Sequence, residues 1–254
     1  MLEIQQIPVL NDNYIYLIHD SLSKETAVID PAVASPVIEV LKENNWRLTY
    51  LLNTHHHSDH VGGNLELKQQ TQCQIVGAAI DEHRIPGIDQ KVQEGDTLKI
   101  GSYTIEIINC AGHTTGHIAF YIPEANALFC GDTLFAMGCG RLFEGSAEQM
   151  QHSLAKFSAL PLNTQIYCAH EYTLANSRFA LSVEPHNNDL LTSIEHIKKL
   201  TSKKQATIPT TLEQELATNP FLRTSSPEIK KNLAMPNASN LEIFTELRER
   251  KNSF

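Results

Sequence analysis

Histidines and an aspartate crowd one short segment of this chain, residues 55–60. The segment directly follows an apolar, strand-like run, so it lies on the loop that leaves a strand. Alternate side chains of an extended segment point the same way, and His55 and His57 can therefore converge on one ion. Asp59 and His60 come at the turn into the next helix, where they can face a second ion. Because a cluster of imidazoles is unfavourable unless a metal or a switch uses it, the spacing predicts a metal site.

Three later segments place a metal-ligating residue type just past the end of an expected strand. His113 lies between glycines, Asp132 belongs to a Gly-Asp-Thr turn, and His170 follows the strand expected at residues 165–168. Loops at strand ends are where binding sites are built. Taken singly, each residue has an ordinary alternative, since a lone loop histidine is usually solvated and such a turn is often only a turn. The remaining isolated histidines are expected to be of that kind: His19, His83, His152, His186 and His196.

Apolar periodicity predicts the elements that position these residues. Up to about residue 172 the chain is made of short β-rich runs and a few helices, which implies two sheets or one large sheet covered by helices. Gly62 and Gly63 are expected to allow a tight turn after the histidine cluster. Beyond residue 172 the chain is mostly helical, so we predict two domains, one over residues 1–172 and a helical one over residues 173–254. Strands are expected at residues 14–18, 27–29, 48–52, 74–76, 97–100, 103–108, 118–122, 127–129 and 165–168, and helices at residues 37–44, 65–71 and 189–200. Capping boxes are expected from Thr211 with Gln214 and from Ser239 with Glu242.

The composition is ordinary for a globular protein, with 41% hydrophobic and 19% charged residues. The formal net charge of −9 argues against a nucleic-acid binder, and an anionic substrate would need cations gathered locally. The N-terminus lacks a basic segment followed by an apolar one, so no leader is expected, and no apolar run approaches the roughly 20 residues of a membrane span. The five cysteines form no Cys-x-x-Cys pair, so no disulfide framework is expected. These features favour a soluble protein of the reducing cytoplasm.

The pattern of residues 55–60, with the three later strand ends, resembles the metallo-β-lactamase superfamily over residues 10–172. The resemblance implies an α+β fold, a four-layer αβ/βα sandwich with metals at one edge of its sheets. It also implies two divalent metal ions, with zinc as the first expectation and iron or manganese as alternatives. Carried over by position, the first metal would have His55, His57 and His113, the second would have Asp59, His60 and His170, and both would share Asp132.

Further segments narrow the resemblance to the glyoxalase II family of hydroxyacylglutathione hydrolases, across essentially the whole chain. In that family the C-terminal helical domain helps to bind glutathione. Where the family often has Lys and Tyr, this chain has Arg141 and Phe143, so the charge is kept and a hydroxyl is lost; Asn252 stands where the family often has Asp. The segments that carry the resemblance are residues 28–31, 111–117, 131–135, 138–145, 170–173 and 218–223. The substrate-binding residues it implies are Arg141, Phe143, Tyr172, Arg248 and Lys251.

The implied reaction is hydrolysis of an S-(2-hydroxyacyl)glutathione, such as S-D-lactoylglutathione, in methylglyoxal detoxification. Two cations lower the pKa of a bridging water from 15.7 toward about 7, supply hydroxide at neutral pH, and stabilise the oxyanion. The expected catalytic carboxylates are Asp59 and Asp132. A thiolate whose conjugate thiol has a pKa of about 8.5 leaves without obligatory protonation, which suits a sequence with no obvious extra acid. Arg248 and Lys251 share a helix face and are expected to bind a glutathione carboxylate, although cations at a helix C-terminus also complement its dipole.

Rival functions remain at this stage. A glutathione persulfide dioxygenase with a single iron would share the first cluster but is expected to lack the long helical tail. A secreted β-lactamase would need a leader, and a nuclease or phosphodiesterase would favour a basic groove. A non-catalytic binding module would be expected to have lost some ligands, and none of the seven is missing. The expected partner is a small molecule and the expected oligomeric state is a monomer.

Overall fold

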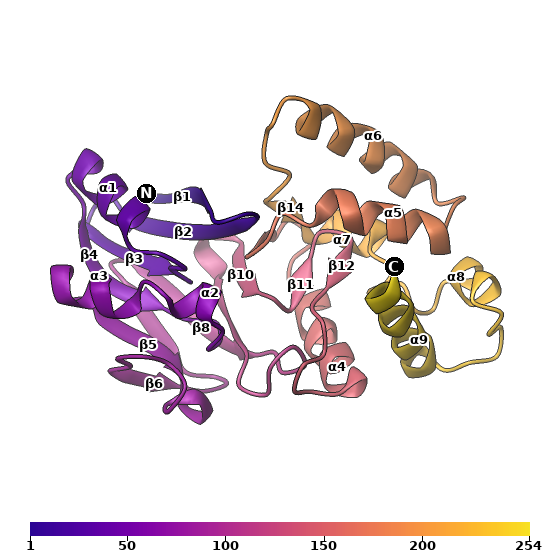
Figure 1. Ribbon diagram of the computed structural model, residues 1–254, viewed down its shortest axis with the longest axis horizontal. Coiled ribbons are helices and arrows are strands. Elements are labelled where there is room, and N and C mark those ends of the chain that lie inside the picture. Colours follow the sequence, from indigo (N-terminus) through magenta and orange to yellow (C-terminus); the bar gives the residue numbers. More distant parts are fainter. The chain divides into compact units, whose positions relative to one another are not determined.

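The computed structural model describes residues Met1–Phe254 and divides into two compact units. Unit 1 comprises Met1–Asn109 and Gly116–Gly131, and unit 2 comprises Cys110–Thr115 and Asp132–Phe254. Figure 1 labels the elements of each unit. The chain thus enters unit 2 briefly, returns to unit 1, and enters unit 2 again. This division differs from the domain boundary expected near residue 172, which stays a prediction.

Unit 1 contains a six-stranded sheet with its strands in chain order, β1 to β6. β1, β2 and β3 are antiparallel neighbours, and β3 to β6 are parallel. Parallel neighbours need a crossover connection, which the helices α1 (Ser35–Asn44) and α3 (Asn64–Thr71) supply on either side of β4. The strands are β1 (Leu2–Val9), β2 (Asn13–Asp20), β3 (Glu25–Ile29), β4 (Arg47–Leu52), β5 (Gln74–Ala78) and β6 (Gln90–Val92).

The six-stranded sheet of unit 1 is covered on both faces, and every residue of β2 is buried. Helices α1 and α3 pack on one face through Val37, Leu41 and Leu67, which join a core cluster with residues of β2 to β5 (Figure 1). The other face meets a second sheet, where the rings of Tyr16 and Phe129 lie 5.5 Å apart. That antiparallel sheet contains β7 (Thr97–Ile100), β8 (Tyr103–Asn109), β9 (Ile118–Ile122) and β10 (Ala127–Gly131). The short helices of unit 1 are α2 (Ser58–Val61), η1 (Ala79–Asp81) and η2 (Pro123–Ala125).

Unit 2 is mostly helical. Its small strands β11 (Leu134–Phe135) and β12 (Gly138–Cys139) form a hairpin, and β13 (Gln165–Cys168) pairs with β14 (Thr210–Thr211). Helices α5 and α6 lie side by side (Figure 1) over an apolar cluster of residues from both helices and the hairpin turn. The helices are α4 (Ala147–Ser158), α5 (Thr173–Val183), α6 (Asn188–Ser202), α7 (Leu212–Thr218), α8 (Pro227–Asn232) and α9 (Asn240–Ser253).

Capping side chains begin several of these helices, largely as predicted. Ser239 and Glu242 form the expected reciprocal box at the start of α9. Thr211 accepts a hydrogen bond from the N–H of Gln214 at the start of α7, but the side chain of Gln214 donates to Ser193 instead of completing a box. The N-cap prediction is therefore confirmed, and only one of the two predicted boxes is complete.

Several elements fall outside the predicted set, among them α4, β1 and the short strands β6, β11, β12 and β14. α4 has its own capping box, Ser146 with Gln149, and buries Met150 and Leu154 one turn apart. The pattern is present in the sequence, but the Gly-rich segment before it reads as loop. β1 is only half-buried along most of its length, so its apolar residues are too sparse to mark a strand.

Gly62 and Gly63 form a turn between α2 and α3, as predicted. Their φ angles of −61° and −85° are open to any residue, so the turn itself does not need glycine. Space is what requires glycine here: a Cβ at Gly62 would collide with the carbonyl oxygen of Ala32, and one at Gly63 would lie 2.8 Å from that of Pro31. The two glycines thus let the end of α2 press directly against the segment that follows β3.

Candidate functional site

The histidine cluster of unit 1 lies on the loop between β4 and α2. Nε2 of His55 is 3.0 Å from Nδ1 of His57, as the alternation of an extended segment predicts. The ring of His60 lies with its centroid 4.0 Å from that of His55, and both side chains are fully buried. Asp59 accepts a hydrogen bond of 3.1 Å from the amide of Asn13. The four predicted ligands of this segment therefore lie together within unit 1.

Asp30, directly after β3, is the hydrogen-bonding centre beside this cluster. Its carboxylate lies 3.0 Å from Nδ1 of His60 and accepts the N–H and the hydroxyl of Thr54 at 2.8 and 2.6 Å. Asp30 is buried and has φ 49°, in the left-handed region that L residues enter rarely. It is not among the predicted site residues, although an acid directly after a buried strand is the same signal that marks Asp132.

Two further histidines, His56 and His117, have partners of their own in unit 1. Nδ1 of His56 lies 3.2 Å from the carboxylate of Asp81, to which Arg84 also donates. His117 is fully buried and stacks on His55 with the ring centroids 4.6 Å apart. Both side chains therefore support the loop that carries the predicted ligands.

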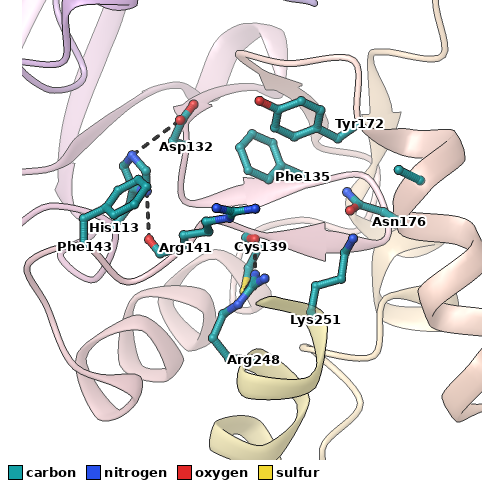
Figure 2. Close-up of a pocket in the computed structure, with 11 residues that line it drawn as sticks. His113, Asp132, Phe135, Cys139, Arg141, Phe143, Tyr172, Asn176, Arg248 and Lys251 are labelled. Atoms are coloured by element: carbon teal, nitrogen blue, oxygen red, sulfur yellow. Dashed lines mark hydrogen bonds and ion pairs between the residues drawn. The ribbon is translucent and has the colours of Figure 1, made fainter. Parts of the chain in front are cut away.

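Within unit 2, three predicted ligands meet at Asp132. Nε2 of His113 lies 3.4 Å from one oxygen of the Asp132 carboxylate, and Nε2 of His170 lies 3.3 Å from the other. All three side chains are buried. Nδ1 of His113 donates to the carbonyl oxygen of Arg141 at 2.8 Å (Figure 2). Because a carbonyl can only accept, this bond fixes the tautomer and leaves the lone pair of His113 on Nε2.

These donors fit a divalent cation. The lone pair of Nε2 in His113 faces a carboxylate oxygen of Asp132, and two lone pairs at that distance repel each other unless a cation or a proton lies between them. His60 has the matching arrangement, with its Nδ1 at the Asp30 carboxylate. Imidazole and carboxylate suit zinc, iron and manganese, and a second ring nitrogen bonded to a carbonyl or carboxylate is the usual support of a metal-ligating histidine.

A cavity of about 480 Å³ opens in unit 2 beside His113 and Asp132. The β11–β12 hairpin contributes Phe135 and Cys139 to its wall, and α5 contributes Asn176 (Figure 2). Asn176 is a lining residue that the sequence analysis misses; the only signal is its position one helical turn after Tyr172. All five predicted substrate-binding residues line this cavity: Arg141, Phe143, Tyr172, Arg248 and Lys251.

The two cations of α9 have different environments in the cavity. Arg248 is 5% exposed, and its guanidinium donates to the carbonyl oxygen of Cys139 at 2.7 Å and lies over the ring of Phe221. Lys251 directs its ammonium toward the cavity (Figure 2). Burial lowers the pKa of Lys251, and the positive charges of Arg248 and Arg141 lower it further. Arg248 therefore has a structural role that the sequence does not indicate, whereas Lys251 lies where an anion would relieve charge repulsion.

Aromatic rings flank His113 and His170, the two histidines of unit 2 that are predicted ligands. The ring of Tyr172 stacks parallel to that of His170, with the centroids 4.8 Å apart. Phe143 is 63% exposed and meets His113 edge to face at 5.2 Å. Tyr172 and Phe143 therefore add aromatic surface to the wall of the cavity.

The fold and these donors define a class. The sequence model described as the metallo-beta-lactamase superfamily matches residues 10–170, and this chain belongs to that superfamily. Solved structures agree on the fold: that of ETHE1 from Myxococcus xanthus has a TM-score of 0.69 at 23% identity, and the match covers 99% of both chains. A metallo-beta-lactamase from Staphylococcus aureus has a TM-score of 0.69 at 21% identity, covering 99% of this chain and 71% of that one. The predicted fold class is confirmed.

The family within this class is equally plain. The model described as hydroxyacylglutathione hydrolase C-terminus matches residues 171–254. A hydroxyacylglutathione hydrolase of Methylococcus capsulatus is 56% identical and covers 100% of this chain and 99% of its own length. One of Roseobacter denitrificans is 46% identical, with coverage of 100% and 99%. The chain belongs to the hydroxyacylglutathione hydrolase family of metal-dependent hydrolases, as its sequence predicts.

The tail favours this family over the dioxygenase alternative through its sequence, not its length. The solved structure from Myxococcus xanthus aligns over 99% of both chains, so a long C-terminal part alone does not separate members of the superfamily. The C-terminal family model does separate them. No helix of the structure is long and apolar enough to cross a membrane.

Proposed function

We propose that this chain hydrolyses an S-(2-hydroxyacyl)glutathione, such as S-D-lactoylglutathione, to glutathione and a 2-hydroxy acid, as in methylglyoxal detoxification. The observation that carries the proposal is the cavity of unit 2, where Arg141, Arg248 and Lys251 gather beside His113 and Asp132. Glutathione carries two carboxylates. In a chain of net charge −9, a local group of cations attracts such an anion to this cavity. The names of the curated relatives support the same substrate class.

The proposal includes two divalent metal ions, with zinc as the first expectation. Such ions, when bound, lower the pKa of water and polarise the thioester carbonyl. Asp132 would bridge them, since its two oxygens face different histidines. Asp59 would complete the second site, with its orientation supported by Asn13. The proposed ligands are His55, His57, Asp59, His60, His113, Asp132 and His170.

The cavity would hold the glutathione part of the substrate, which does not react. Lys251 and Arg141 would bind its carboxylates, and Phe143 and Tyr172 would contact its apolar parts and keep water from the reacting carbonyl. The leaving thiolate needs no proton donor at neutral pH, because the conjugate thiol has a pKa of about 8.5. The five cysteines are all buried and none forms a disulfide. A monomer in the reducing cytoplasm is part of this proposal.

The first test measures thiol release from S-D-lactoylglutathione and the metal content of the same preparation, with and without a chelator. We predict that Asp132→Ala abolishes hydrolysis and lowers the metal content, because the proposed bridge removes charge repulsion between two cations. Asp189→Ala, an exposed aspartate on α6, is the matched control and should change neither. Near-normal turnover and metal content in Asp132→Ala would show that the bridge is misassigned. A single metal per chain in the fully loaded protein would contradict the two-metal proposal.

A further inference from the structure

The turn of the β11–β12 hairpin is held in place from outside. Only Ala136 and Met137 lie between the two strands, and Met137 has φ 55°, a left-handed conformation that a residue with a side chain adopts at a free-energy cost. Gly138 follows, and a Cβ there would lie 2.5 Å from the amide nitrogen of Asn176. Neither turn residue is the glycine that such a tight hairpin connection prefers, so the turn depends on its surroundings.

Two side chains of α7 and its C-terminus bind the backbone of this turn. Glu215 accepts the N–H of Met137 at 2.7 Å. Asn219 donates to the carbonyl oxygens of Phe135 and Gly138 at 3.1 and 2.9 Å, and to Glu215 at 2.9 Å. Both side chains are buried, with exposed fractions of 1% and 0%. Together they hold the residue at each end of the turn and the strained residue inside it.

A buried acid is an unusual choice for this task. Removing a carboxyl group from water is unfavourable, and an apolar side chain of similar size often gives equal or greater stability. Here the second oxygen of Glu215 accepts the hydroxyl of Thr210 at 2.9 Å, so each polar atom is used. The arrangement therefore favours a precise backbone position over stability.

The turn it fixes carries part of the pocket wall. Phe135 and Cys139 line the cavity from the two strands of the hairpin. Asp132 lies shortly before the hairpin and Arg141 shortly after it, and both line the same cavity. A displacement of the turn would therefore shift cavity-lining residues on both sides of the hairpin, Asp132 before it and Arg141 after it.

We propose that Glu215 and Asn219 form a clamp that positions the β11–β12 hairpin, and through it the substrate pocket. They are positioning residues, since neither lines the cavity. The proposal rests on the proposed function for its effect on substrate, whereas its effect on the hairpin is independent of any substrate. Asn219 belongs to residues 218–223, one of the segments that carry the family resemblance, so the clamp assigns a structural role to that segment.

The test uses the metal-loaded full chain and two readouts. The first is amide hydrogen exchange of the peptide that contains residues 134–139, and the second is calorimetric affinity for a non-hydrolysable S-alkylglutathione, with KM and kcat measured beside it. Asn219→Ser shortens the side chain so that it cannot reach both carbonyl oxygens. We expect faster exchange of the hairpin and affinity weakened on the order of tenfold, less than the hundredfold that a displacement of about 1 Å can cause. KM should rise more than kcat falls, because the affected contacts bind the unreacting part of the substrate.

Two further variants separate positioning from general stability. Glu215→Gln keeps an oxygen for the N–H of Met137 and can donate to Thr210, so it should retain hairpin protection and most of the affinity. Glu184→Gln is the matched control: Glu184 is a buried acid of the same unit that accepts from Arg223, and it does not contact the hairpin. It should lower the melting temperature without changing hairpin exchange or affinity.

The outcomes distinguish the two proposals. Unchanged exchange of residues 134–139 in Asn219→Ser overturns the clamp, whatever the enzyme does. If the wild type is active, and Asn219→Ser shows faster hairpin exchange but unchanged affinity and KM, then the clamp does not position the substrate pocket. A wild type that neither binds the glutathione derivative nor hydrolyses the thioester overturns the proposed function, and the exchange data then still decide the clamp.

Discussion

At the scale of single residues, Arg248 and Lys251 show that two equivalent cations in a sequence need not be equivalent in a structure. Both lie on α9 and line one cavity. Arg248 is committed to the carbonyl oxygen of Cys139, so its removal would disturb the wall as well as the charge. Lys251 is the cleaner probe of the substrate's carboxylates.

The lowered pKa of Lys251 gives a prediction with a definite sign. A bound anion favours the charged ammonium, so affinity for an S-alkylglutathione should be full at neutral pH. It should fall as the pH rises through a value below the ordinary 10.5. Lys251→Arg should keep the affinity at alkaline pH. Lys251→Ala should weaken it about tenfold at neutral pH, as loss of a charge-assisted hydrogen bond does, and by less at alkaline pH, where the wild-type ammonium is itself deprotonated.

Calorimetry over a pH series checks this prediction, with Lys199→Ala on the exposed face of α6 as the control. A wild-type affinity that stays constant up to the ordinary lysine pKa would contradict the assignment. So would an alkaline decline that persists unchanged in Lys251→Ala.

Asp30 carries a second prediction at this scale. Because its carboxylate holds Nδ1 of His60, Asp30→Ala should leave the ring free to rotate and weaken metal binding about 10- to 100-fold. Competition against a chelator of known affinity measures the change. Asp20→Ala is the matched control, since Asp20 is a buried acid of the same unit that binds the backbone of Leu22 and Ser102. Equal metal affinity in Asp30→Ala and wild type would show that Asp30 does not support His60 as a metal ligand.

At the scale of elements, strand ends and helix caps could be predicted from the sequence. The long-range contacts that these elements make could not. The cluster after β4 follows from spacing alone, because alternation in an extended segment forces His55 and His57 together. The partners of the turn at Met137 could not be predicted, since Asn219 lies more than eighty positions away in the chain. Asp30 is a different case: its position directly after a buried strand is a local signal for a site residue, but its partner His60, thirty residues on, is not predictable from spacing.

The clamp on the hairpin also predicts how stability depends on pH. Burial raises the pKa of Glu215 to about 7, although hydrogen bonds from Met137, Asn219 and Thr210 lower it in part. A glutamate in the unfolded chain titrates near about 4.3. Between these values the folded state holds the extra proton, so this group favours folding at low pH, and its contribution declines as the pH rises through about 7.

Urea unfolding of wild type and Glu215→Gln at a series of pH values measures this contribution. The free energy of unfolding of the wild type should fall relative to that of the variant from about pH 5 to above pH 7. Taking the difference between the two proteins removes the pH dependence of metal binding, which both share. Parallel curves would show that Glu215 is ionised throughout, and that its buried charge is compensated by its donors.

At the scale of the whole molecule, the family could be predicted from combined motifs, whereas the compact units could not. Residues 55–60 with the later strand ends were enough for the superfamily, and the tail was enough for the family. Composition changes near residue 172, but compactness depends on contacts, and these assign Asp132 and all that follows to unit 2. The short segment Cys110–Thr115 joins the same unit because Ala111 accepts the hydroxyl of Ser153 at 2.7 Å, a contact that periodicity does not reveal.

The passage of Cys110–Thr115 through unit 2, between two segments of unit 1, limits how the gene can recombine. A single boundary drawn through the gene, wherever it falls, cannot separate the two units completely, because Cys110–Thr115 of unit 2 is encoded upstream of Gly116–Gly131 of unit 1. Recombination that exchanged only residues 132–254 would combine His113 of one parent with Asp132 of the other. The hydrogen bonds from Gly145 to Gly112 and from Ser153 to Ala111 would then link segments from different parents. The two units are therefore expected to be inherited together, and new substrates to arise by point substitution in the cavity rather than by shuffling.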